Sequence, residues 1–188
     1  EKRNTKGFVG LIIAGVLSII VALGALGFFQ FYQTADNLYN KGNIFGEVPM
    51  KDEAVTAVKI TGYAENPIAT IDGGTKLYLI EFTKTDNDDF GYASLEVKEG
   101  DKLIEKLKST DDLVANPVIV AAKMRKSGAD GAVRNYTSEF KATISENENI
   151  SKLAETEYYV SVYEFDKDRQ FAYIVAGIAG IIALVFFY

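Results

Sequence analysis

The chain has no cysteine, no histidine and no tryptophan among its 188 residues. Without histidine and cysteine it has neither a Ser-His-Asp nor a Cys-His catalytic set. Disulfides, thiol redox chemistry and ordinary structural zinc sites are excluded for the same reason. The absence of cysteine is compatible with an exported domain that folds without disulfides. We therefore predict no catalytic residue, no metal ligand set and no bound cofactor.

With histidine and cysteine absent, carboxylates are the abundant side chains that could take part in catalysis. An enzyme that uses two acidic side chains is compatible with this composition, but no pair stands out by spacing, and a charged surface accounts for them. The acidic residues 86–89 offer oxygen ligands of the kind that calcium prefers. They lack the remaining ligands at loop spacing, and no glutamate stands at a twelfth position. A solvent-exposed hairpin tip is the preferred interpretation.

The formal net charge is −6, and three of the 20 basic side chains lie in the N-terminal tail. The rest of the chain is therefore more acidic still. Nucleic-acid binding requires clustered cations that neutralise phosphates, so we predict no nucleic-acid partner. The negative charge is better explained as a surface that keeps a domain soluble.

Two uncharged apolar stretches, residues 7–29 and 171–188, lie at opposite ends of the chain. About 20 apolar residues in a helix are needed to cross a hydrocarbon core of roughly 30 Å. A buried helix of a soluble protein is the alternative, but such helices are rarely apolar on every face. A cleaved signal peptide is the other alternative for the first stretch, whose apolar region exceeds the usual ~7–15 residues. We predict two transmembrane helices.

Three cations before the first stretch, Lys2, Arg3 and Lys6, predict the orientation. By the positive-inside rule they place the N-terminus in the cytoplasm, with the central domain extracytoplasmic and the protein integral to the plasma membrane. Neither apolar stretch contains an ionisable residue. This argues against a transporter or a proton pathway, which need such residues.

Small residues recur four apart on both stretches. Such stripes let helix backbones approach closely in lipid, either between the two spans or against a partner, although small residues are common in any membrane helix. The positions concerned are Gly10, Ala14, Ser18 and Ala22 on the first stretch and Ala172, Ala176 and Gly180 on the second.

The region between the spans is predicted to consist mostly of strands. β-Branched and aromatic residues separated by turn signals predict strands over residues 54–64, 75–83, 90–97, 117–124 and 157–165. A helix is predicted after Gly100, with Asp101 as its N-cap. Residues 134–144 are ambiguous and are assigned a further strand.

These elements predict an α+β protein with five parts. They are a basic cytoplasmic tail (1–6), the first span (7–29), a juxtamembrane helix and connector (30–47), an extracytoplasmic β-rich domain (48–168) and the second span (171–188). A helix between the third and fourth strands is similar to the order in an OB-fold, a small five-stranded barrel. Another α+β sheet is the alternative.

The leading hypothesis is a non-enzymatic membrane protein whose extracytoplasmic domain binds a partner protein or copies of itself beside the lipid bilayer. The alternative is a receptor or sensor domain for a saccharide, peptide or ion. Tyrosines of the domain, including Tyr63, Tyr78, Tyr92, Tyr136 and Tyr159, would then form an aromatic platform. Packing of these rings in the core is the simpler interpretation of the same pattern.

Overall fold

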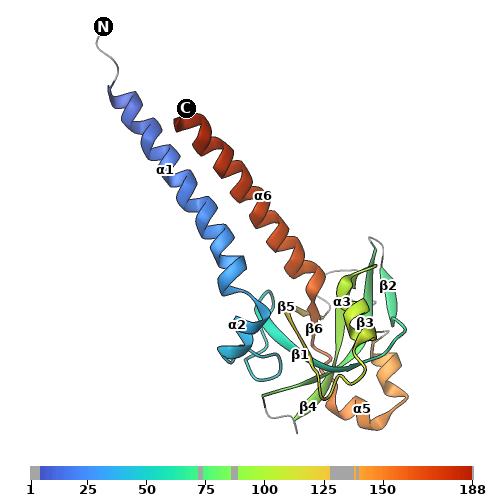
Figure 1. Ribbon diagram of the computed structural model, residues 1–188. Helices are drawn as coiled ribbons and strands as arrows, with labels where there is room; N and C mark the ends of the chain where they lie inside the picture. The colour runs from blue at the N-terminus through green and yellow to red at the C-terminus, as the bar shows by residue number, and fades with distance from the viewer. Residues whose placement is uncertain (1–4, 72–73, 86–88, 128–137, 139, 188) are drawn as a thin grey trace. The chain divides into compact units, whose positions relative to one another are not determined.

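The computed structural model describes residues 5–71, 74–85, 89–127, 138 and 140–187 (Figure 1). The chain divides into two compact units. One comprises Thr34–Phe165, and the other contains the residues up to Gln33 and those from Asp166 onward.

The larger unit is built around a closed barrel of five strands. β1 pairs with β3 on one side and β5 on the other, β3 with β4, β4 with β6, and β6 with β5, which completes the circle. Only the β4–β6 pair is parallel among these. The short β2 adds to β3. The strands are β1 (Val55–Tyr63), β2 (Ala69–Ile71), β3 (Thr75–Thr83), β4 (Phe90–Lys98), β5 (Val118–Lys126) and β6 (Tyr158–Ser161).

The first four predicted strands are confirmed as β1, β3, β4 and β5, with ends that differ by two residues or fewer. The predicted helix is α3 (Lys102–Ser109), and the Asp101 carboxylate accepts the Leu103 N–H at 2.8 Å as its N-cap. The amphipathic face of α3 buries Leu103 and Leu107 in the main core. β2 and α5 (Glu148–Leu153) were not predicted.

The predicted strand over residues 157–165 is wrong in its second half. β6 ends at Ser161, and α6 (Val162–Phe187) begins at the next residue. The Ser161 hydroxyl oxygen accepts the backbone N–H of Glu164 at 3.0 Å, which satisfies an otherwise unpaired amide at the helix start. This cap converts a strand-like run of valine and tyrosine into the first turn of a helix.

The strand predicted over residues 134–144 is wrong in the part that the structure describes. Ser138 and residues 140–145 are helical, while 134–137 and 139 lie outside the described residues. Phe140 and Ile144 are both buried. Their spacing of four places them on one face of a helix.

The barrel encloses the main hydrophobic core. Alternate residues of β3, Tyr78, Ile80 and Phe82, lie in it. Leu77 faces the other way and packs with Tyr159 in a second cluster. The first half of β3 is therefore apolar on both faces, because Leu77 is buried outside the barrel and Tyr78 is buried inside it.

The segment before β1 belongs to this core as well. α2 (Ala35–Asn40) precedes an isolated bridge between Ile44 and Ala57. The Phe45 side chain is fully buried, and its ring lies 4.8 Å from that of Phe82 in an edge-to-face arrangement.

The smaller unit is helical. α1 (Thr5–Gly27) continues into a π-helical turn, η1 (Phe28–Tyr32), and the second long helix is α6. Two segments, Val9–Tyr32 and Val162–Val185, are long and apolar enough to cross a membrane by length and composition.

We expect Phe45→Ala to lower the free energy of unfolding by about 3–5 kcal/mol, because it leaves a cavity beside Phe82. Phe90→Ala is the matched control: Phe90 is 39% exposed, and its loss should cost less than about 1 kcal/mol. Urea unfolding followed by the near-ultraviolet circular dichroism of the tyrosines measures both. Equal losses would show that residues 44–45 are not part of the core.

Candidate functional site

A small pocket lies on the outer face of β1, β3 and β4. We call it the β3 pocket; its volume is about 270 Å³, and it is lined by Gly62, Tyr63, Ala64, Leu79, Glu81 and Tyr92. Leu79 and Glu81 face outward because the residues that alternate with them, Ile80 and Phe82, lie in the core.

An irregularity in β1 shapes this pocket. The β1–β3 register shifts between Ile60 and Gly62, so that Gly62 pairs with Glu81 after a bulge at Thr61. A Cβ atom on Gly62 would lie 3.3 Å from the Glu81 Cβ, which is closer than most side-chain contacts. The missing side chain therefore leaves room next to the glutamate.

Hydroxyl groups hold the Glu81 carboxylate in place. The Thr61 hydroxyl donates to Glu81 Oε1 at 3.0 Å. Tyr92 lies directly opposite Glu81 in the β3–β4 register. Burial raises the pKa of Tyr92, and the charge and hydrogen bond of Glu81 raise it further. The phenol therefore stays protonated and donates to the carboxylate.

A second concentration of polar groups lies on β5, β6 and the start of α6. We call it the Arg125 cluster: Arg125 Nε lies 3.2 Å from both Asp52 Oδ1 and Glu53 Oε1, and its Nη1 pairs with Glu164. Lys123, two residues earlier on the same face, pairs with Glu53 at 3.0 Å. The Arg125 side chain is only 12% exposed.

The backbone of Glu53 has a φ of +66°, a left-handed conformation that non-glycine residues rarely adopt. The Asp52–Glu53 turn is also fixed by the Lys126 N–H, which donates to Asp52 Oδ1 at 2.9 Å. Burial alone would raise the pKa of Asp52, but this hydrogen bond and the charge of Arg125 lower it. The turn thus presents the ionised Asp52 carboxylate to Arg125.

Glu96 is the most deeply buried acid beside this cluster, at 6% exposure. The Ser161 hydroxyl donates to its Oε2 at 2.6 Å. Burial raises the pKa of Glu96, the nearby Glu164 carboxylate raises it further, and the hydrogen bonds from Ser161 and Thr75 only partly offset this. Glu96 therefore tends toward the neutral form more than an exposed glutamate does.

The Arg125 cluster joins the turn before β1 to β5 and to the first turn of α6. Its buried cations, Lys123 and Arg125, have carboxylate partners within the domain, so we interpret it as a structural junction. It was not predicted from the sequence. The sequence does contain a signal for the start of α6: Ser161 is followed three residues later by Glu164, just before an apolar run. This signal places Glu164 in the first turn of the helix.

The predicted helix-packing residues lie at different depths in the helical unit. Ala176 is buried; Ala14, Ser18, Ala22, Ala172 and Gly180 are half-buried; Gly10 is exposed. A Cβ atom on Gly10 or Gly180 would meet nothing within 4 Å. These two glycines therefore have open space around them.

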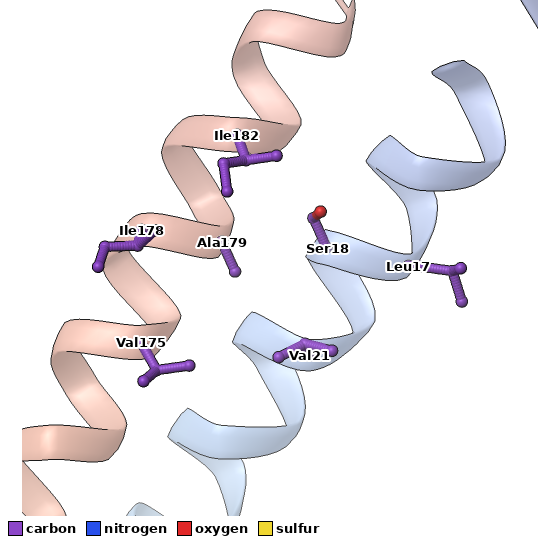
Figure 2. Close-up of a pocket in the computed structure, with 7 residues that line it drawn as sticks. All are labelled: Leu17, Ser18, Val21, Val175, Ile178, Ala179 and Ile182. Carbon is purple, nitrogen blue, oxygen red and sulfur yellow. The ribbon is translucent and has the colours of Figure 1, made fainter. Parts of the chain in front are cut away.

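An apolar groove of about 340 Å³ lies between α1 and α6. Ser18 lines it from α1 and Ala179 from α6 (Figure 2). The Ser18 hydroxyl donates to the Ala14 carbonyl at 2.9 Å, so its polar group is satisfied within its own helix. The other lining residues are Leu17, Val21, Val175, Ile178 and Ile182.

The remaining residues singled out by the sequence are separated from one another. Of the tyrosines, Tyr63 and Tyr92 meet in the β3 pocket, Tyr78 and Tyr159 are buried, and Tyr136 lies outside the described residues. Residues 86–88 of the acidic tip also lie outside them, and Asp89 pairs with Lys84 at 2.6 Å. Among the described residues, no three metal-ligating side chains converge.

No protein-family model, no curated protein and no solved structure matches this chain. Function is therefore inferred from the geometry of its own residues.

We expect Arg125→Met to lower the free energy of unfolding by about 3 kcal/mol, because it leaves the half-buried carboxylate of Glu164 without its cation. The control is Lys76→Met, whose pair with Glu99 is at the surface and should cost less than about 1 kcal/mol. Urea titration of both variants measures this. Similar losses in the two would contradict the role given to Arg125.

The pH dependence of the free energy of unfolding, compared between wild type and Glu96→Gln, tests the burial of this acid. Because the pKa of Glu96 is raised in the folded state, the folded protein holds this proton more tightly than the unfolded chain. Wild-type stability should therefore fall as the pH rises from the ordinary glutamate pKa of 4.5 through the folded pKa. Glu96→Gln has no carboxylate at this position and does not lose stability in this way. The free energy of unfolding of the variant, relative to that of wild type, should therefore rise across this pH range. A difference that does not change with pH would contradict the prediction.

Proposed function

We propose that this chain is a non-enzymatic, two-span membrane protein whose extracytoplasmic barrel domain mediates protein–protein interaction or assembly at the membrane surface. The observation that carries the proposal is the exposure of large apolar side chains along both long helices, among them Leu23, Phe171 and Leu184, the last 72% exposed. Each Å² of such surface costs about 25 cal/mol in water, and lipid removes this cost.

The orientation is part of the proposal. Lys2, Arg3 and Lys6 favour a cytoplasmic N-terminus, which makes the barrel extracytoplasmic and the plasma membrane its location. The barrel folds without disulfides, since the chain has no cysteine.

We also propose an OB-like fold for the barrel. The support is the order of its elements: α3 stands between the third and fourth barrel strands, β4 and β5, and the third and fifth strands, β4 and β6, pair in parallel. OB-folds bind their ligands on the outer face of strands two and three. In this chain those strands are β3 and β4, which carry Glu81 and Tyr92 of the β3 pocket.

Interaction through this outer face is favoured over the opposite one. On β4, β6 and β5 the outward residues Glu96, Ser161 and Lys123 are buried within the domain. On β1, β3 and β4 a pocket remains open next to Glu81. A partner at the membrane surface therefore finds its recognition groups on β3 and β4.

Single-cysteine labelling tests the topology, because the chain offers no competing thiol. Lys108→Cys places a thiol on the exposed side of α3. We expect a membrane-impermeant maleimide to label it on intact cells, whereas Lys2→Cys should react only after permeabilisation. The reverse pattern would show that the domain is cytoplasmic.

Extraction in mild detergent, followed by native mass measurement, tests the interaction. We expect particles heavier than one chain, from a second copy or a co-purifying protein. A strictly monomeric particle without any other protein would contradict the proposed function.

The β3 pocket also supports the second candidate, a receptor or sensor domain for a saccharide, peptide or ion. Selective binding to the folded state raises the melting temperature. A thermal-shift screen of the full chain with these ligand classes distinguishes the two functions. Stabilisation by one small ligand, together with a monomeric particle, would favour the second.

A further inference from the structure

We propose that the β3 pocket binds a cationic group, an alkylammonium or a guanidinium, and that a lysine or arginine side chain of the partner protein supplies it. This inference rests on the interaction function proposed above and adds the chemistry of the contact. Four features of the pocket lead to it.

The first feature is a carboxylate that hydroxyl groups of the domain hold in place. The hydrogen-bond partners of Glu81 are the hydroxyl groups of Thr61 and Tyr92. Within the described part of the chain, no lysine or arginine forms an ion pair with it. Glu81 contrasts in this respect with Glu53 and Glu164 of the Arg125 cluster, which hold buried cations. A carboxylate fixed by two donors keeps acceptor capacity for a third.

The second feature is an aromatic wall. Tyr92 lies opposite Glu81, and the Phe90 ring lies 6.0 Å from the Tyr92 ring in an edge-to-face arrangement. Phe90 faces solvent in part, so the aromatic surface extends beyond the pocket. A cation next to an aromatic face gains attraction from the ring quadrupole, in addition to the carboxylate charge.

The third feature is the size of the pocket. Its volume of about 270 Å³ lies below the range of roughly 300–1,000 Å³ that holds drug-sized ligands. The space exists because Gly62 and Ala64 lack bulk on the β1 side. It suits the end of one side chain better than an oligosaccharide.

The fourth feature is the sign of the surrounding charge. The Glu65 carboxylate is close enough to Tyr63 to raise the pKa of that phenol, after the larger effect of burial. The whole chain carries a formal charge of −6. Anionic ligands are therefore repelled from this face, and cationic ones are attracted to it.

Binding to the full-length protein in detergent micelles tests the proposal by calorimetry. The probes are a short peptide with a single lysine, the same peptide with norleucine in its place, and n-butylammonium. We expect saturable binding of the lysine peptide and none of the norleucine peptide. Glu81→Gln should weaken binding about tenfold, because it keeps the hydrogen bond from Thr61 but removes the charge.

Two further variants sharpen the result. Tyr92→Leu removes the ring and should also weaken binding, by about fivefold. Glu105→Gln removes an exposed carboxylate from α3 and should bind as wild type does. Circular dichroism and melting temperatures confirm that each variant is folded. Equal binding by Glu81→Gln and wild type, or no saturable binding of any cation, would overturn the proposal.

The probes distinguish two sources of the cation, a side chain of a partner protein and a free amine. Binding of the peptide but not of n-butylammonium indicates a protein partner, and equal binding of both indicates a free amine, which would overturn the protein source. Co-purification keeps this inference distinct from the proposed function. If a partner co-purifies equally with wild type and Glu81→Gln, the pocket inference fails while the interaction stands; if wild type has no partner, the interaction itself fails.

Discussion

Closure of the barrel is the constraint on which the rest of the structure depends. β1 pairs with both β3 and β5, so the sheet has no free edge at that point. In a closed sheet, alternate residues of each strand must lie inside or outside. The inside is filled by residues such as Ile60, Ile80 and Leu95. Barrel side chains that can contact a ligand or a partner are therefore confined to the outer positions and to the ends of the strands.

The outer positions divide into two groups with different roles. On β5 and β6 the outer residues Lys123 and Ser161 are buried, and the charges of Arg125 and its acidic partners balance one another within the domain. Around β3 the outer position of Glu81 remains beside open space. The same alternation thus produces a structural junction on one side of the barrel and, in the proposed function, a recognition surface on the other.

Much of the barrel was predictable from the sequence because its strands carry local signals, whereas the errors lie where a long-range contact decides the structure. Residues 75–83 are β-branched and aromatic between turn residues, and they form β3 with the predicted bounds. Residues 162–165 are rich in valine and aromatic residues, as strands are, but the Ser161 cap and the pair between Glu164 and Arg125 place them in a helix. The β3 pocket depends on the bulge that brings Gly62 opposite Glu81, and cross-strand register cannot be determined from one strand alone.

Hydrogen exchange of the backbone amides, measured on the protein in lipid nanodiscs, tests barrel closure most directly. Amides paired within a closed sheet exchange only when the domain opens, whereas those on a free edge exchange quickly. We predict slow exchange on both sides of β1, where residues 55–60 pair with β5 and residues 59–63 pair with β3. Fast exchange along β1, as for a free edge strand, would contradict closure.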